Sequence, residues 1–217
     1  MTSWGKKVTV NPAPNWPDSD APTTQGRMHK LRGATRLAHA RVEASLPLMA
    51  PSLTTATYVR VLEAFHGFYA PLEPRLSRAA AEHGVAIALG DRGKVALLVA
   101  DLTALGKSVA EVDALPRCAD LPRVTSASQA IGVLYVLEGA TLGGRVILRH
   151  LGAALGLDAA GGAAFFSGYG DGTGAMWTRF SRHVDAASAI DTDVAIGAAI
   201  ETFETLTVWL DAALARS

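Results

Sequence analysis

The chain has 217 residues, of which 49% are hydrophobic and 18% charged, so it has enough apolar material for a core, and global disorder is excluded. Twenty Lys and Arg residues balance twenty Asp and Glu residues, which argues against the basic field that a nucleic-acid partner requires. The single cysteine, Cys118, cannot form a disulfide within the chain. Lys6 and Lys7 are not followed by the apolar segment of a secretory signal, and no apolar run nears the roughly 18 residues of a membrane span. We therefore expect a cytoplasmic protein without a membrane partner.

The N-terminal stretch and the first helix differ in pattern. Residues 1–26 contain four prolines among polar residues, so we expect a flexible, Pro-rich tail ahead of one domain over residues 27–217. From Met28 to Leu46, apolar or small residues recur every three or four positions, which predicts one face of a helix. Pro47 is expected to end it.

A second helix is expected to begin at Ser52 or Thr54, either of which can cap it. Pro71 and Pro74 are expected to kink or divide this helix before it continues over residues 76–83. Its predicted buried stripe consists of Tyr58, Leu62, Phe65, Tyr69 and Leu72.

The middle of the chain predicts one short and one long helix. Residues 94–105 have one apolar face and stop before a glycine, whereas residues 107–123 are expected to form a loop or irregular turn. Thr125 or Ser126 then caps a long helix that is expected to run through Leu151.

The C-terminal part begins with a glycine-rich connection over residues 157–174, which is expected to lead into a helix over residues 175–187. Asp191 or Thr192 caps the last helix. The predicted apolar stripe of this helix is Ile196, Ile200, Phe203, Leu206, Leu210 and Leu214. Since no period-two run bounded by hairpin turns occurs, the sequence predicts an all-α, single-domain fold of about seven helices.

Four glycines lie inside the predicted long helix, at positions Gly132, Gly139, Gly143 and Gly144. Each interior glycine costs a helix about 0.8–1 kcal/mol relative to alanine, so the last three cost roughly 3 kcal/mol. Gly132, Gly139 and Gly143 share one face by their spacing. Two explanations are open: a tight crossing with another helix, or a flat ligand that lies directly on the backbone.

Among the histidines, His39 is the best candidate for a metal ligand, because Glu43 lies four residues later and can orient its ring. The alternative is an ordinary pair on a solvated helix face. Six arginines on three segments have two similar interpretations, as partners of a ligand with two carboxylates or as solvated side chains. They are Arg32, Arg36, Arg145, Arg149, Arg179 and Arg182.

Three stretches together resemble the heme oxygenase family, most of all its soluble, biliverdin-producing bacterial members of the bacteriophytochrome-associated group. The matching stretches are residues 31–39 with Glu43, residues 135–145, and residues 165–170 followed by Trp177 and Phe180. The first looks like the family's proximal helix, the second like its distal, glycine-bent helix, and the third like the stretch that follows it. The resemblance covers residues 27–215 and implies the heme oxygenase-like helical fold.

The resemblance also implies a role for the candidate residues. His39 would be the axial ligand of the heme iron, and Glu43 would hold the orientation of its imidazole. Gly139 and Gly143, with Gly144 beside them, would lie above the macrocycle, where a bulkier side chain would clash with oxygen bound on that side.

By the same resemblance, basic partners of the heme propionates are expected at Arg32, Arg182 and Arg179. One position departs from the family pattern. Many members carry an aspartate just after the first distal glycine, where it organises proton-donating waters, and this chain has Ala140 there. Thr141, Arg145 or another polar group would then have to hold these waters.

The implied reaction uses heme as both cofactor and substrate. With O2 and electrons from a reductase or ferredoxin, it would yield biliverdin, carbon monoxide and ferrous iron, and a phytochrome would be one acceptor of the biliverdin. Ala140 motivates an alternative, a heme carrier or sensor that keeps the pocket without efficient turnover. Further alternatives are a purely structural helical protein and a related helical enzyme with a thiamin-like ligand or a di-iron centre; the lack of additional Glu-x-x-His pairs argues against the di-iron centre.

Overall fold

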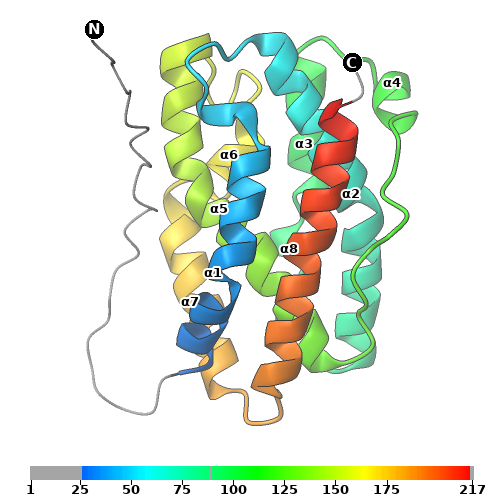
Figure 1. The fold of residues 1–217 in the computed structure, drawn as a ribbon, viewed down its shortest axis with the longest axis vertical. Coiled ribbons are helices and arrows are strands. Elements are labelled where there is room, and N and C mark those ends of the chain that lie inside the picture. Colours follow the sequence, from blue (N-terminus) through cyan, green and yellow to red (C-terminus); the bar gives the residue numbers. More distant parts are fainter. Residues whose placement is uncertain (1–25, 88, 216–217) are drawn as a thin grey trace, which may run out of the picture.

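Helices make up nearly all of the regular structure in residues 26–87 and 89–215, the part of the chain that the computed structural model describes (Figure 1). No strand occurs in these residues, and the predicted all-α fold of about seven helices is confirmed. The predicted tail lies outside the described residues, except for Gly26. The α-helices are α1 (Arg27–Ser45), α2 (Thr55–Glu82), α3 (Val95–Ala104), α4 (Val109–Asp113), α5 (Ala127–Leu155), α6 (Ala164–Ser167), α7 (Thr173–Ala186) and α8 (Thr192–Ala215).

Helix α1 follows its predicted bounds closely and ends two residues before Pro47. The residues of its predicted stripe that are buried are Leu31, Thr35, Ala38 and Val42. The three- and four-residue spacing therefore marks the side of α1 that packs on the rest of the protein.

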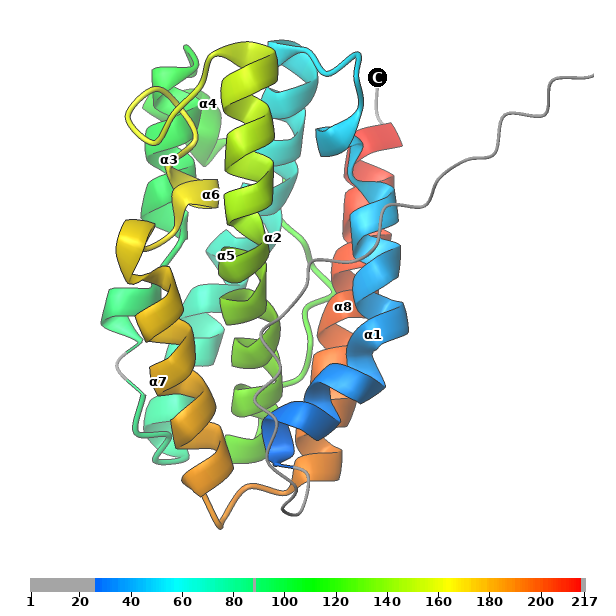
Figure 2. The ribbon, with the colours of Figure 1, turned by 90° about the vertical axis from the view of Figure 1, so that its left-hand side faces the viewer.

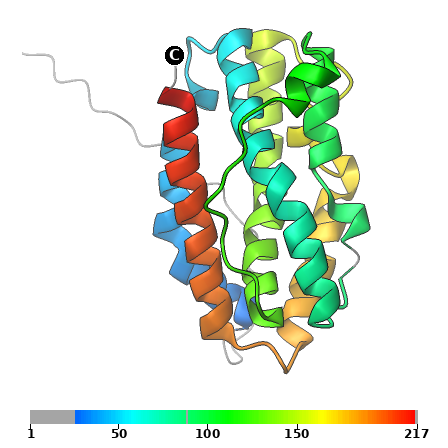
Figure 3. The ribbon, with the colours of Figure 1, turned by 90° about the vertical axis from the view of Figure 1, so that its right-hand side faces the viewer.

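Helix α2 begins after Thr54, whose hydroxyl accepts a hydrogen bond from a first-turn backbone N–H at 3.1 Å. Pro71 and Pro74 do not divide it, so this part of the expectation was wrong, although the helix bends in its middle (Figure 3). Proline cannot donate to the carbonyl four residues earlier. In place of Pro71, the backbone N–H of Cys118 donates to the Gly67 carbonyl at 2.9 Å, so this carbonyl is not left without a partner.

The stretch over residues 107–123 is not irregular throughout, because it contains the five-residue helix α4. Ser108 accepts from the backbone N–H of Glu111, and the Glu111 carboxylate accepts from the backbone N–H of Ser108 at 2.8 Å. This capping box starts a helix too short to produce a periodic apolar pattern, which is why the sequence predicted a loop.

Helix α5 begins after Ser126, whose hydroxyl accepts from the backbone N–H of Gln129 at 3.2 Å. It runs to Leu155, one turn past the predicted end, because the left-handed conformation that stops it is adopted by Gly156 (φ 68°). By length and composition it is the one helix among the described residues that could cross a membrane, but 56% of that apolar window is buried inside the fold. A core helix has the same properties.

The glycine-rich connection over residues 157–174 contains the four-residue helix α6, and α7 starts at Thr173 instead of residue 175. Helix α8 starts where predicted, and the Asp191 carboxylate accepts from the backbone N–H groups of Asp193 and Val194.

Helix α8 is the support on which α1, α2 and α5 all pack. Its stripe differs from the prediction, because Ile196, Ile200 and Leu214 are only partly buried. The buried positions are Ala195, Ala198, Ala199, Thr202, Phe203, Leu206 and Leu210. Small residues thus occupy the first half of the contact surface, which lets a neighbouring helix approach closely.

Helices α1 and α5 run in the same direction, and α7 lies on the side of α5 that faces away from α1 (Figures 1 and 2). Both α1 and α5 pack extensively on α8 but have at most slight direct contact with each other. This arrangement decides which residues of the two helices can face a common ligand.

Candidate functional site

His39 projects from α1 with its side chain about one third exposed. Its Nδ1 atom lies 3.6 Å from a carboxylate oxygen of Glu43, the residue one helical turn later. The imidazole ring also packs edge-on against Phe203 of α8, with 5.6 Å between ring centroids. Both contacts restrict the orientation of the ring. Nδ1 faces Glu43, and Nε2 is the nitrogen on the other side of the ring.

One contact shows how α1 and α5 are aligned. The hydroxyl oxygen of Thr35 on α1 lies 3.4 Å from the hydroxyl oxygen of Tyr135 on α5. Since the two helices run in the same direction (Figures 1 and 2), one further turn brings His39 level with Gly139. The predicted proximal and distal residues therefore lie at the same height in the bundle.

The glycines of α5 have different surroundings although three of them share a face. A Cβ atom at Gly132 would lie 2.2 Å from the carbonyl oxygen of Ala195, so this glycine permits the crossing with α8. At Gly139 and Gly143, a Cβ atom would meet no described atom within 4 Å. The tight-crossing explanation thus applies to Gly132, whereas the open side of Gly139 and Gly143 leaves room for the ligand explanation.

Two predicted site residues lie elsewhere on α5. Thr141 is buried, its hydroxyl donates to the Leu137 carbonyl at 3.3 Å, and its methyl group packs closely on Gly168. A Cβ atom at Gly144 would lie 2.6 Å from the carbonyl oxygen of Phe166. Neither residue is turned toward the open space beside Gly139, so the structure does not support a contact of Thr141 or Gly144 with a ligand there.

The three predicted arginines are exposed and come from two helices. Burial raises the pKa of the Tyr135 hydroxyl, and the bond to Thr35 and the nearby charge of Arg32 on α1 oppose this rise. Arg179 and Arg182 of α7 line one hollow of the surface. Trp177 of the same helix contacts α5, with 6.0 Å between its ring centroid and that of Tyr135.

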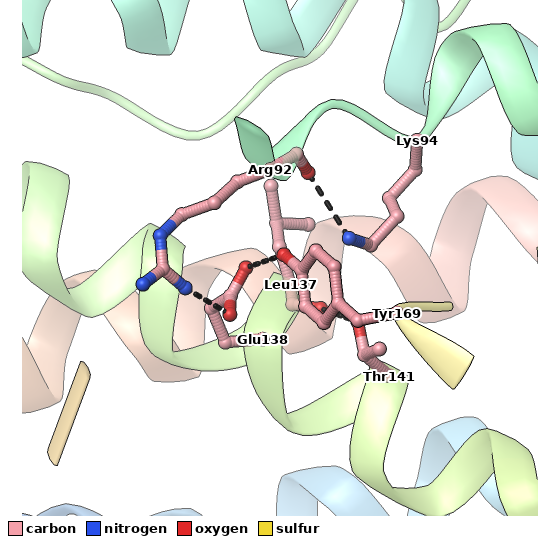
Figure 4. A network of polar contacts seen from close by, with 6 residues as sticks. All are labelled: Arg92, Lys94, Leu137, Glu138, Thr141 and Tyr169. Atoms are coloured by element: carbon pink, nitrogen blue, oxygen red, sulfur yellow. Dashed lines mark hydrogen bonds and ion pairs between the residues drawn. The ribbon is translucent and has the colours of Figure 1, made fainter. Parts of the chain in front are cut away.

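Sequence reasoning missed a cluster of three buried charges and a half-buried tyrosine directly behind the glycine segment. We call it the Glu138 network, and it consists of Arg92, Lys94, Glu138 and Tyr169 (Figure 4). Glu138 forms an ion pair with Arg92 and accepts a hydrogen bond from the Tyr169 hydroxyl at 2.7 Å. Lys94 Nζ donates to the Arg92 carbonyl at 3.1 Å and lies 3.6 Å from the centroid of the Tyr169 ring. Burial raises the pKa of the Tyr169 hydroxyl and lowers the pKa of Lys94 to about 8. The one available signal was a glutamate inside an apolar helix, since a buried carboxylate needs partners.

The described residues can be compared with what heme requires of a protein. In residues 26–87 and 89–215, no three His, Cys, Asp or Glu side chains gather as a metal site. A single histidine suffices when a macrocycle holds the metal, and a contact-free glycine surface can accept a flat ring. The residues present therefore fit heme.

Comparisons with known proteins identify the family and the fold. The sequence model of the family described as heme oxygenase matches residues 27–212. The fold is similar to that of the NO- and CO-bound heme oxygenase of Neisseria meningitidis, with a TM-score of 0.72 and 22% identity over 89% of this chain and 96% of that one. It is also similar to heme oxygenase from Leptospira interrogans, with a TM-score of 0.67 and 17% identity over 86% and 99%. No curated protein sequence matches the chain.

Proposed function

The chain belongs to the heme oxygenase family, and we propose that it binds heme between α1 and α5 and oxidises it to biliverdin, carbon monoxide and ferrous iron. O2 and electrons from a reductase or ferredoxin would be the co-reactants. The observation that carries the proposal is the open space at Gly139 and Gly143, level with His39. Two glycines that destabilise the helix without gaining a contact are explained if a flat ligand occupies that space.

His39 is the proposed axial ligand, through Nε2. The Glu43 carboxylate lies 3.6 Å from Nδ1, so it favours a proton on that nitrogen and leaves the lone pair of Nε2 free for the iron. Phe203 limits rotation of the ring from the α8 side. Heme, when bound, supplies both the iron centre for oxygen reduction and the macrocycle that is opened.

Gly139 and Gly143 are proposed to bring the backbone of α5 close to the opposite face of the macrocycle. Their lack of side chains leaves room for a small diatomic ligand, and Ala140 adds no hydrogen-bonding group. On this face, waters would have to be held by backbone groups, because Thr141 is buried on another side of the helix.

The propionates are proposed to lie toward Arg32 and Tyr135, which offer a guanidinium and a hydroxyl near each other. Arg179 and Arg182 of α7 are the second proposed group of cationic partners. Delivery of biliverdin to a phytochrome and a cytoplasmic location complete the proposal.

A second function, a heme carrier or sensor, is favoured by one observation, the absence of a hydrogen-bonding side chain at Ala140. Aerobic incubation of the purified heme complex with ascorbate or with a reductase and ferredoxin separates the two functions. Release of biliverdin and carbon monoxide supports the oxygenase, whereas a Soret band that persists under these conditions supports the carrier.

The same assay tests the proposed ligand. His39→Ala is expected to weaken heme binding and abolish pigment formation, whereas His29→Ala, on an exposed position of the same helix, is expected to leave both unchanged. An unchanged Soret spectrum and full turnover in the His39→Ala protein would contradict the assignment.

A further inference from the structure

Among the described residues, none contacts the open side of the glycine segment of α5, residues 139–143, in a way that could hold it in place. A Cβ atom at Gly139 or Gly143 would meet no described atom within 4 Å. Interior glycines also make a helix easier to bend. The height of this backbone above a ligand must therefore be set from the other side of the helix.

On that other side, Glu138 is held through both of its carboxylate oxygens. Oε2 pairs with Arg92 and Oε1 accepts from the Tyr169 hydroxyl (Figure 4). Lys94 places a second cation against the face of the Tyr169 ring. Since removing one member of a buried ion pair leaves an uncompensated charge, this network strongly opposes displacement of the helix.

The segment that supplies Tyr169 is itself anchored to α3. The Asp101 carboxylate accepts from the backbone N–H of Ala164 at 2.7 Å and of Phe165 at 2.8 Å. Asp101 is almost completely buried, so these bonds are protected from water.

Two close packing contacts join this anchored segment to the same side of α5. The Thr141 methyl group packs on Gly168, and the Phe166 carbonyl occupies the space in front of Gly144. Glu138, Thr141 and Gly144 recur at three-residue spacing and therefore lie along one side of the helix. The anchored segment thus contacts α5 over two turns directly behind the open glycines.

We infer that Glu138 and Tyr169 are positioning residues, which fix the height of residues 139–143 above the bound ring through the Glu138 network. The inference rests on the proposed function, since it assigns the open side of this segment to heme. Neither residue is assigned a contact with heme. Their effect is transmitted by the backbone that follows Glu138.

The test compares two variants that each delete one tyrosine hydroxyl. Tyr169→Phe removes the bond to Glu138. Tyr58→Phe, the matched control, removes a buried bond of 2.9 Å to the Gly162 carbonyl, which is not part of α5. Hydrogen exchange of the amides of residues 139–144 is measured in the heme-free protein. Tyr169→Phe is expected to accelerate it about tenfold or more, whereas Tyr58→Phe leaves it close to wild type.

A second readout uses the carbon monoxide complex of the loaded protein, where the C–O stretching band reports on the backbone above the ring. Tyr169→Phe and Glu138→Gln are expected to shift or broaden the band, and Tyr58→Phe to leave it unchanged. An exchange rate in the Tyr169→Phe protein equal to that of wild type would overturn the inference. If the wild-type protein instead fails to bind heme, the proposed function fails, while the exchange experiment still decides whether the network positions the segment.

Discussion

The same substitution at two glycines of one helix should have opposite effects on stability. Replacing an interior helical glycine with alanine gains about 1 kcal/mol when the methyl group meets nothing. Gly139 satisfies that condition, because no described atom lies within 4 Å of the new carbon. Gly139→Ala should therefore stabilise the heme-free protein by about 1 kcal/mol and raise Tm by roughly 2–4 °C.

Gly132→Ala should do the reverse. Its methyl carbon would lie 2.2 Å from the carbonyl oxygen of Ala195 and 2.9 Å from Cβ of Ala198. A backbone carbonyl cannot rotate away, so α5 and α8 must separate, at an overpacking cost near the upper end of about 1–3 kcal/mol. After the gain in helix propensity, a net loss of about 2 kcal/mol remains, which lowers Tm by roughly 4–8 °C.

The assay is thermal and urea unfolding of the heme-free variants, followed by heme and carbon monoxide titrations of each. Gly139→Ala should weaken the binding of carbon monoxide to the heme complex while it stabilises the heme-free protein. Gly139→Leu should impair oxygen binding more than heme binding. Loss of stability in Gly139→Ala would refute the open-face reasoning. If Gly139→Ala gains stability but its oxygen affinity is unchanged, the surface at Gly139 does not face the oxygen-binding side of heme.

Three further predictions follow from named contacts. Burial lowers the pKa of Lys94 from 10.5 to about 8, so between these pH values the unfolded chain binds more protons than the folded one. Lys94 therefore makes the free energy of unfolding rise with pH across this window. Urea unfolding of the Lys94→Met protein should lack that rise. Ala140→Asp should speed biliverdin formation by supplying a carboxylate for water, and Ala140→Val should not; equal rates in the two variants would count against a role for water at this position. Tyr135→Phe should weaken heme binding several-fold in a Soret titration, since it removes a hydroxyl beside Arg32, and an unchanged affinity would place the propionates elsewhere.

The helices themselves could be predicted because their buried sides repeat every three or four residues. The stripe of α1 and the capping residues Thr54 and Ser126 follow from short-range patterns that the structure preserves. His39 and Glu43 could be paired for the same reason, as they are one turn apart. Each of these features depends on neighbours within four positions of the chain.

The Glu138 network could not be predicted in this way. Arg92 and Tyr169, its two partners, are 46 and 31 residues away in the sequence, with no spacing that links them. The surroundings of the glycines were equally hidden, since Gly132 and Gly139 lie on the same face and only the path of α8 distinguishes them. Such features depend on tertiary packing, which local patterns do not specify.

The path of α8 explains why α1 and α5 stay apart at the height of Gly139. At its first turns, Ala195 and Ala199 present small side chains, and α5 comes so close that only glycine fits at position 132. Further along α8, Phe203 stands against the His39 ring on the α1 side. Small residues where α5 crosses and a bulky ring beside α1 leave the two helices without close contact at the height of Gly139. The separation of α1 and α5 is thus determined by side-chain size along α8, which supplies none of the residues proposed to bind heme. Enlarging Ala199 should therefore disturb the heme site without touching it.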